Sequence, residues 1–594
     1  FGCKDTKKMR VSCIFCAEII IFALSLQIIR TTFHAERLTN IYNNPRNNDI
    51  ASQRISIITS NNKESKDMKK VIFTQEWMTM HPYEKPNEVD QYYTELANEI
   101  YHALDEACFT HQFKNVEEAK QLALSIAGYF EDVISGTCIW KTFTAECKKR
   151  YGTYIPFYEN EKEFIQNTLN DDESPYDPDE INYADIKFLC WHHYQQSSYV
   201  QEPVPFLFST LELAAKMAYN VLDKEYETAP ENERLYDFLC ELPTDEDKFY
   251  GYRDALAWFH YGCFFNVGNR FRLQMELERL AHSPQGFNDV IAYSIQIEHT
   301  MNSRNNLLAL TSAEWLAKVS EHHPAHKLWT EIDYKGTRAF KMIKEDENFF
   351  YLKDLYDASE KDASDKDSEE EKLYRVRKDS TNIEDASAFL SGEQLMVTNL
   401  FYFGGDWWQT GALLNPNYEE NKEQIEAEKA QVNHEQPIND YNLLKAKGYG
   451  DKFIFLEDVK TLKSFLKEVG FELPANIKFP PKYEKGIIVC GSPYTGINIC
   501  FGMAHCIASP ENPYYNAEHA ELDSFNIISG LGRPFPYEIV CKLIENNMLP
   551  DANLFTSKYV REIGLKVTQA YIQFLADYYL MGRKDKDLSP AELW

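Results

Sequence analysis

The chain has 594 residues, of which 44% are hydrophobic and 14% aromatic, and it carries a formal net charge of -30. This composition excludes a disordered polymer and allows several folded domains with sizeable cores. Nucleic acids and anionic membranes are negatively charged too, and the sequence shows no local basic patch, so we expect neither as a partner. The acidity is expected to keep the protein in solution and to favour a basic protein partner.

Residues 1–67 differ in charge and pattern from the rest. They hold ten Lys or Arg and six Asp or Glu, so residues 68–594 keep 52 of the 62 basic and 86 of the 92 acidic residues, a formal charge of -34. The run 11–29 is apolar and about as long as a membrane helix, and Lys7 and Lys8 precede it. This pattern is typical of a signal peptide or a signal anchor.

A start of translation at Met68 is the alternative that we favour. Residues 39–67 are rich in Asn, Ser and Ile without amphipathic order, whereas clear patterning begins after Met68. Residues 1–67 are then a non-native upstream extension. Residues 68–594 contain no signal segment, and we expect them to be cytoplasmic and to have no membrane partner.

The thirteen cysteines are scattered along the chain. Only Cys13 and Cys16 have the Cys-x-x-Cys spacing, whereas a structural zinc site needs four ligands, usually in two such clusters. Scattered thiols in a long chain are typical of a reducing compartment. We therefore predict free thiols and no disulfide bonds.

Helices are predicted for most of residues 88–323. Apolar residues recur every three or four positions over 88–109, which indicates one buried helix face. Asn115 followed by Glu118 has the form of a capping box, and Gly136 is suited to end the helix that follows. Further helices are expected at 178–194, 206–224, 252–281 and 312–320. These elements predict a mainly helical domain over residues 68–325.

The pattern changes after Pro324. Residues 329–340, 347–355 and 395–403 favour strands of a small antiparallel sheet, and two acidic inserts interrupt them at 357–372 and 415–434. A last unit is expected with strands at 453–456, 486–490 and 497–501 and helices at 462–469, 537–546 and 560–581. The predicted fold class is α+β, with a second domain over residues 326–594.

The densest cluster of metal-ligand types is the run of residues 321–326. His322 and His326 would share a face if one helix continued through both, and two histidines at this spacing can hold zinc with a third ligand from elsewhere. Pro324 argues against such a helix, and the Glu of a His-Glu-x-x-His protease is missing. A solvated helix end is the alternative that we favour.

Other residues could take part in chemistry if the fold brought partners to them. His192 and His193 follow Asp185 at a distance that could pair an imidazole with a carboxylate, although a packed helix end is the favoured reading. Ser492 lacks the flanking glycines of a nucleophile elbow, and His505 and Cys506 are adjacent, so their side chains are expected to point apart. The acidic run 362–371 lacks the Gly of a calcium loop, and 491–496 lacks the Lys of a phosphate loop.

Trp407 and Trp408 are the candidate binding residues. They follow a glycine pair at the end of an apolar run, and one outward-facing ring would expose aromatic surface of the kind found at recognition sites. A position in the core is the favoured alternative.

Four short sequence segments indicate a family. They are VIFTQEW at 71–77, YEKP at 83–86, GGDWW at 404–408 and ASPENPYY at 508–515. The chain resembles, over most of residues 68–594, an uncharacterised family of acidic proteins from Bacteroides-type gut bacteria. That family has no established activity, fold or site residues, so the resemblance implies none.

Two functions remain open at this point. The first is a cytoplasmic, non-enzymatic binding or scaffold protein without a cofactor, because the acidic, aromatic-rich chain shows no complete catalytic motif. The alternative is a metal-dependent hydrolase whose ligands are dispersed in the sequence and include His192, His193, His322 and His326. We favour the first.

Overall fold

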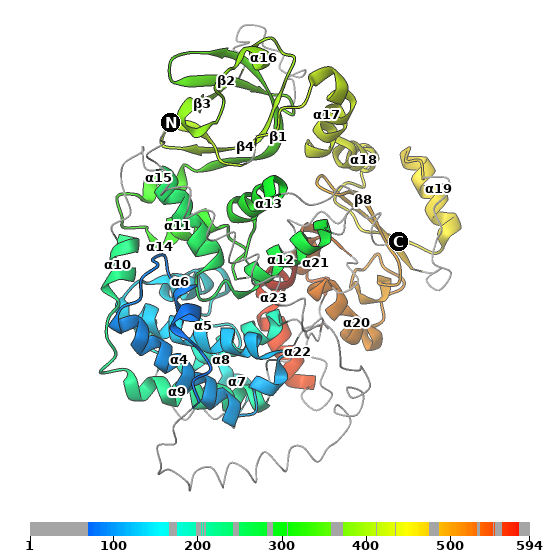
Figure 1. Ribbon diagram of the computed structural model, residues 1–594. Helices are drawn as coiled ribbons and strands as arrows, with labels where there is room; N and C mark the ends of the chain where they lie inside the picture. Colours follow the sequence, from blue (N-terminus) through cyan, green and yellow to red (C-terminus); the bar gives the residue numbers. More distant parts are fainter. Residues whose placement is uncertain are drawn as a thin grey trace. The chain divides into compact units, whose positions relative to one another are not determined.

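The fold is α+β, as the sequence predicts, with a helical first part and two sheets in the second part (Figure 1). The computed structural model describes residues 69–165, 175–197, 204, 206, 209–240, 249–281, 289–305, 307–357, 372–411, 413–433, 435–473, 486–530, 535–549, 552 and 561–580. The apolar run 11–29 and all of the acidic insert 357–372 except its two ends lie outside these residues. Val71–Trp594 form one compact unit, and the domain boundary expected near residue 325 stays a prediction.

The first part is built from short and medium helices. They are α3 (Thr74–Met78), α4 (Glu88–Glu106), α5 (Val116–Ser135), α6 (Ile139–Tyr151), α7 (Glu161–Phe164), α8 (Tyr183–Gln196), α9 (Ser209–Glu225), α10 (Glu233–Cys240), α11 (Phe249–Tyr261), α12 (Val267–Ala281), α13 (Asp289–Asn302), α14 (Ser312–Val319) and α15 (His326–Thr330). Helices α4 and α5 pack against each other, and α9 packs against both α4 and α8.

The predicted start and end of α5 are confirmed. The side chain of Asn115 accepts a hydrogen bond from the backbone N–H of Glu118 at 2.9 Å, and Gly136 ends the helix with a φ of 65°. The Glu118 carboxylate does not complete the capping box, because it accepts from the backbone N–H of Lys114 at 3.3 Å. One half of the predicted box is therefore present.

Two of the helices predicted in the first part are wrong in their bounds. Helix α8 begins at Tyr183 and not at residue 178, because the Asn182 side chain donates to the carbonyls of Asp177 and Glu180 and holds this stretch as a loop. The helix expected over 252–281 is divided into α11 and α12. The side chain of Asn266 donates to the carbonyl of Phe259 at 2.6 Å and so satisfies the end of α11.

The second part begins with a closed five-stranded barrel. Its strands are β1 (Asp333–Glu345), β2 (Phe349–Asp354), β3 (Tyr374–Arg377), β4 (Met396–Phe403) and β5 (Asp406–Gln409), in the order β1-β2-β3-β5-β4. The expected antiparallel pairing is confirmed except between β3 and β5, which are parallel. The strand expected at 329–340 starts late, because α15 occupies its first residues.

Alternating residues fill the barrel. Its interior holds Phe340, Met342, Phe350, Leu352, Tyr374, Val376, Met396 and Leu400, with Phe389 from the short helix α16 (Ser387–Leu390). Gly404 and Gly405 join β4 to β5 with φ angles of 60° and 89°. Two positive φ angles in a two-residue hairpin define a type I′ turn, which explains the glycine pair before Trp407.

A separate three-stranded antiparallel sheet and more helices follow (Figure 1). The strands are β6 (Ile454–Leu456), β7 (Ile487–Ser492) and β8 (Gly496–Cys500), and the helices are α17 (Tyr418–Val432), α18 (Glu435–Ala446), α19 (Val459–Val469), α20 (Ala517–Ser529), α21 (Tyr537–Glu545), α22 (Arg561–Ala570) and α23 (Ile572–Leu580). The helix expected over 560–581 is interrupted at Tyr571. The acidic insert expected at 415–434 contains helix α17.

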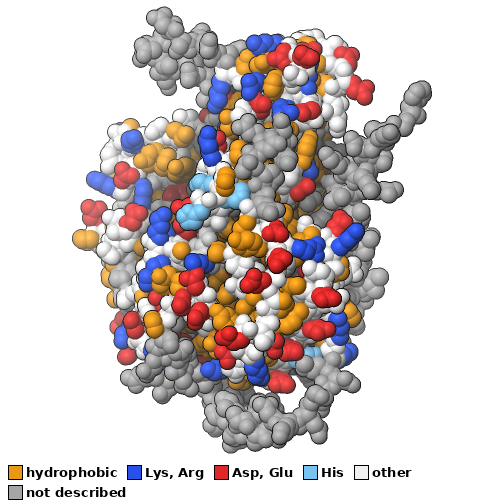
Figure 2. Space-filling view, turned by 90° about the vertical axis from the view of Figure 1, so that its left-hand side faces the viewer, with side chains coloured by type: hydrophobic (Ala, Val, Ile, Leu, Met, Phe, Trp, Pro, Cys, Tyr) orange, Lys and Arg blue, Asp and Glu red, His pale blue; other side chains and the backbone are white. Residues whose placement is uncertain are grey.

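The main core joins both parts of the chain. It contains Trp77, Tyr129, Trp315, Phe401, Cys490 and Phe574 among many others. The ten described cysteines are all free thiols. On the face drawn in Figure 2, Lys and Arg side chains are interspersed with Asp and Glu side chains.

None of the described helices is by itself long and apolar enough to cross a membrane. The pair α5 and α6, bent by 92°, passes that test together by length and composition only.

Candidate functional site

A buried chain of hydrogen bonds joins α5 to the segment that follows α3. His81 lies just after α3, and its Nε2 atom is 2.9 Å from the Glu131 carboxylate of α5, with both side chains 2% exposed. The other ring nitrogen, Nδ1, lies 3.1 Å from the carbonyl oxygen of Trp77. We call His81, Glu131, Asn232, Tyr83 and Asp90 the His81 network.

Both ring nitrogens of His81 therefore face acceptor atoms. A carbonyl oxygen can only accept, so Nδ1 carries a proton that it donates to Trp77. Burial lowers the pKa of His81, but the charge and hydrogen bond of Glu131 and the Trp77 carbonyl outweigh it, and the pKa is raised above 6.5. The arrangement therefore favours a charged imidazolium that donates to a carboxylate.

The other Glu131 oxygen extends the network to α10. It accepts from the side-chain amide of Asn232, the residue just before α10, at 2.7 Å. The same amide donates to the Tyr83 hydroxyl at 2.6 Å, and that hydroxyl donates to Asp90 of α4 at 3.2 Å. Because each buried polar group has a partner, the network fixes three helices to the segment after α3.

Arg234 closes the network at the surface. Its guanidinium lies 3.6 Å from the ring centre of Tyr83, donates to the carbonyl of Lys85 at 2.7 Å and reaches the Asp90 carboxylate at 3.4 Å. A cation over an aromatic face is attracted to it, so Arg234 both covers Tyr83 and compensates the buried charge of Asp90.

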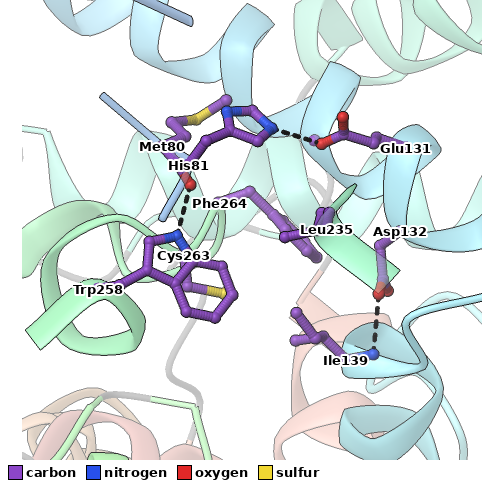
Figure 3. A pocket seen from close by; sticks show the side chains of 10 residues that line it. Met80, His81, Glu131, Asp132, Ile139, Leu235, Trp258, Cys263 and Phe264 are labelled. Carbon is purple, nitrogen blue, oxygen red and sulfur yellow. Dashed lines mark hydrogen bonds and ion pairs between the residues drawn. The ribbon is translucent and has the colours of Figure 1, made fainter. Parts of the chain in front are cut away.

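A small cavity adjoins this network (Figure 3). His81 and Glu131 point toward each other at one side of it, and Phe264, Leu235 and Trp258 contribute apolar walls. Its volume is about 10 Å³, counted as the space that the centre of a water molecule can occupy. This is room for about one water. Ligand pockets are typically larger by more than an order of magnitude, so this cavity in its present form does not admit a substrate.

Asp132, the neighbour of Glu131, has a different role. Its carboxylate accepts from the backbone N–H groups of Ile139 at 2.9 Å and Trp140 at 2.7 Å, and it also accepts from the hydroxyl of Thr137. It therefore caps the start of α6. Burial raises the pKa of Asp132 to about 6, against the opposing effect of these hydrogen bonds.

The structure does not pair Asp185 with either neighbouring histidine. Asp185 accepts from the hydroxyls of Tyr129 at 2.7 Å and Tyr176 at 2.8 Å, and burial raises its pKa to about 6. The hypothesis of an imidazole–carboxylate pair at this position is not supported by these contacts.

His192 and His193 both lie in the core. Nδ1 of His192 is 2.9 Å from the hydroxyl of Tyr578, and Nε2 is 3.3 Å from the carbonyl of Phe265. His193 lies 3.0 Å from the Ser125 hydroxyl, and burial, with the charge of His192, keeps its pKa well below 6.5. Each histidine thus connects α8 to another element.

His322 and His326 do not share a helix. Helix α14 ends at Val319, His322 lies in the following turn and His326 begins α15, as Pro324 suggests. Nδ1 of His326 bonds to the carbonyl of Ala317 at 2.8 Å. Within the described part of the chain, no group of three or more His, Cys, Asp or Glu side chains could hold a metal ion.

Trp408 and Trp407 occupy opposite sides of β5. Trp408 is buried, stacks on Phe249 of α11 at 4.7 Å and donates to the carbonyl of Phe403 at 3.1 Å. Trp407 is partly buried and packs against Tyr374 at 5.0 Å. Both rings thus make core contacts, and a binding role for either stays a prediction.

Ser492 and His505, the remaining candidates, contact partners that lie elsewhere in the chain. The Ser492 hydroxyl donates to the Glu538 carboxylate at 2.6 Å. His505 pairs with Asp523 at 2.7 Å, and burial raises the pKa of the neighbouring Cys506 thiol to about 12. A thiol with so high a pKa is a poor nucleophile.

Sequence reasoning missed the His81 network because its members are far apart in the chain. His81 and Glu131 are 50 residues apart, and Asn232 lies 101 residues beyond Glu131. One signal was present: Glu131 and Asp132 are adjacent acidic residues in an otherwise apolar stretch of α5. Buried acidic residues need partners, so such a pair marks a buried polar site.

Comparison with known proteins gives one match. The family of proteins of unknown function DUF3843 matches residues 71–397 and 404–581. No curated protein and no solved structure matches the chain. The family thus spans most of the sequence, which confirms the expected relation to an uncharacterised family, and the chain belongs to the DUF3843 family.

Proposed function

We propose that this protein is a non-enzymatic binding or scaffold protein that takes a basic protein partner on the outer face of α4 and α9. The observation that carries this proposal is a set of three carboxylates that repel one another on these two packed helices, two of them exposed and the third, from α9, half-buried. We name it the acidic face and define it by Glu95, Glu99 and Glu225.

Helix α4 has an unusual charge content. Its 19 residues include six Asp or Glu and no Lys or Arg. Glu95 and Glu99 are exposed and one turn apart, a spacing at which like charges destabilise a helix by a few tenths of a kcal/mol. Asp105 and Glu106 lie at its C-terminus, where the helix dipole disfavours negative charge.

Helix α9 adds a third carboxylate to this face. Glu225 ends α9 and accepts from the hydroxyl of Tyr92 on α4 at 2.9 Å. The pKa of Glu99 is raised by partial burial and then by the negative charges of Glu225 and Glu95, although Lys224 opposes this effect. Lys224 offsets only part of this repulsion.

A cationic partner relieves the repulsion on binding. Clustered lysine or arginine side chains gain attraction to the three carboxylates, and charge complementarity selects such partners and speeds their encounter. The His81 network supports the same reading, because it fixes α4 against α5 and α10 and so holds the acidic face on a rigid support.

The test uses the full chain and a fluorescein-labelled poly-lysine peptide. We expect the Glu95→Gln/Glu99→Gln/Glu225→Gln variant to bind the peptide about tenfold more weakly, since each surface ion pair contributes up to about 1 kcal/mol. The control variant is Glu419→Gln/Glu423→Gln/Glu426→Gln, which removes the same charge from exposed positions of α17. Equal losses in both variants would show that only net charge matters and would refute the proposed face.

The proposal also includes a location and a source. A cytoplasmic protein of Bacteroides-type bacteria fits the free thiols and the sequence resemblance. The alternative of a metal-dependent hydrolase gains no support from the contacts of His192, His193, His322 and His326, which serve packing or lie at the surface.

A further inference from the structure

Two exposed cysteines lie next to the cavity drawn in Figure 3. Cys138 comes just before α6, and Cys240 is the last residue of α10. Ile139, the chain neighbour of Cys138, lines the cavity, and so does Leu235 of α10. The cavity therefore brings the segment of each cysteine beside the other, although about 100 positions separate them in the sequence.

Hydrogen bonds attach both segments to the end of α5. The backbone N–H of Asn232, just before α10, donates to the hydroxyl of Ser135, the last residue of α5, at 2.8 Å. The carboxylate of Asp132, also on α5, accepts from the first backbone N–H of α6 at 2.9 Å. The start of α10 and the turn that contains Cys138 thus have a common support.

Tyr236 contacts one of the thiols and lies near the other. Its hydroxyl donates a hydrogen bond to Cys240, one helical turn further along α10. This bond and the charge of Cys240 raise the pKa of Tyr236, and the charge of Cys138 adds to the effect. Exposed charges act on one another only over about 10 Å, so the three groups share one small area of the surface.

The two thiols differ in their surroundings. Burial raises the pKa of Cys138, and the charge of Asp132 adds to this, whereas Lys141 opposes it. The thiolate is the reactive form of a cysteine, so Cys138 is slow to react with a small oxidant in solution. We therefore assign the first step of an oxidation to Cys240 and the second step to Cys138.

We propose that Cys138 and Cys240 form a reversible disulfide bond when the protein meets a peroxide. The Cys240 thiolate attacks one oxygen of hydrogen peroxide, the O–O bond breaks, and hydroxide leaves from a sulfenic acid. The Cys138 thiolate then attacks that sulfur, the S–O bond breaks and the S–S bond forms. The two hydroxide ions take up the two thiol protons, so two thiols and one peroxide give one disulfide and two water molecules.

The bond requires a small movement at the end of α10. Both cysteines are free thiols in the structure, which therefore represents the reduced form. A disulfide needs Cα atoms within about 7 Å of each other. Helix ends fray, and Cys240 is the final residue of its helix, so its last turn can move toward Cys138. The bond would tie α10 to the start of α6 beside the His81 network.

Separate oxidation of each exposed thiol is the competing explanation. Cys108 is the matched control, because it is exposed like Cys138 and has nearly the same left-handed backbone, with a φ of 59° against 61°. No contact of the structure joins Cys108 to another described cysteine. Exposure and backbone conformation are therefore equal in the two residues, and only Cys138 has a nearby second thiol.

The first experiment identifies the bond by peptide mapping. The full chain is treated with one equivalent of hydrogen peroxide, blocked with N-ethylmaleimide and digested with trypsin, which releases residues 121–141 and 235–248 with one cysteine each. We expect these two peptides to be joined in the main product and to separate with dithiothreitol. Their joined fraction stays the same on about tenfold dilution of the protein, because the reaction is intramolecular.

The second experiment traps the sulfenic acid with dimedone. The Cys138→Ser variant cannot complete the second step, so dimedone labelling of Cys240 rises several-fold above that of wild type. The control Cys108→Ser leaves the labelling of Cys240 and the joined peptides unchanged. Circular dichroism of each variant checks that the fold is retained.

The third measurement is the thermal midpoint of the oxidised and reduced protein. Closing a loop of about 100 residues restricts the unfolded chain, and we expect the midpoint to rise by roughly 4 °C on oxidation. The Cys138→Ser variant should show no such rise.

Three results would overturn the proposal: joined peptides that contain other cysteines instead, equal dimedone labelling of Cys240 in wild type and Cys138→Ser, or joined peptides that disappear on dilution. The inference does not rest on the acidic face, because no basic partner enters these measurements and none of its residues is changed.

Discussion

The Nε2 atom of His81 lies 2.9 Å from the carboxylate of Glu131 in a part of the core where both side chains are almost fully buried. The pair joins residues 50 positions apart in sequence, and Asn232 extends it to the start of α10. Because the carbonyl of Trp77 occupies the other ring nitrogen, the histidine cannot turn away without losing two partners. The pair thus fixes the position of α3 relative to α5.

Replacing Glu131 by Gln removes the charge that His81 faces. Breaking a buried pair by removing one partner leaves an uncompensated charge, and we expect a loss of about 3 kcal/mol in the free energy of unfolding. The measurement is the urea midpoint at neutral pH. Glu347→Gln, in the exposed turn before β2, is the matched control and should lie within about 0.5 kcal/mol of wild type. A Glu131→Gln midpoint equal to that of the control would contradict a charged pair.

The same pair predicts a pH dependence. The pKa of His81 is raised in the folded protein above its ordinary value of 6.5, so its contribution is complete below pH 6.5 and is lost as the pH rises through the folded pKa. Wild type should therefore lose stability relative to His81→Asn as the pH rises above 6.5. Urea midpoints measured across this pH range test the prediction. Parallel curves of midpoint against pH for the two proteins would show that His81 is neutral throughout.

The raised pKa of Asp185 predicts a second dependence of stability on pH, in a lower pH range. Burial raises its pKa from 3.8 to about 6, so its contribution to stability is complete below pH 3.8 and is lost as the pH rises through about 6. The difference is on the order of 3 kcal/mol, because one pKa unit corresponds to about 1.4 kcal/mol. Asp185→Asn should lack this part of the decline and keep only the part that Asp132 causes, since the pKa of Asp132 is raised to about 6 as well. If both proteins declined equally between these pH values, another group would be responsible.

Replacing two helical glycines by alanine tests how closely their surroundings are packed. A Cβ atom on Gly128 of α5 would lie 2.7 Å from the Cβ atom of Phe264, whereas one on Gly251 of α11 would meet nothing within 4 Å. We expect Gly128→Ala to destabilise the protein by roughly 1–3 kcal/mol through overpacking. Gly251→Ala should stabilise it by about 0.5–1 kcal/mol through helix propensity. Thermal midpoints that move in the same direction would be evidence against the close contact.

Local signals account for the elements that could be predicted. Helices α4 and α5 have periodic apolar faces and polar N-cap residues, and both could be placed from their own sequence. The break between α11 and α12 could not, because it depends on Asn266, whose side chain folds back onto α11. The parallel pairing of β3 with β5 joins segments separated by β4, and no local pattern reports such a pairing.

The candidate site was harder to predict than the fold. The close spacing of His322 and His326 is a pattern that predicts metal ligands. In the structure they lie in a turn and at a helix start. His81 has no neighbour of its own type, and its partner is fixed only when α5 packs beside the segment after α3.

Chemical cross-linking locates the basic partner most directly. A water-soluble carbodiimide joins a lysine amine to a carboxylate with loss of water, so poly-lysine bound to the full chain becomes attached where it lies. We expect peptide mapping to find the attachments at Glu95, Glu99 and Glu225. Attachments spread evenly over exposed carboxylates, including Glu419 and Glu423 of α17, would contradict a specific acidic face.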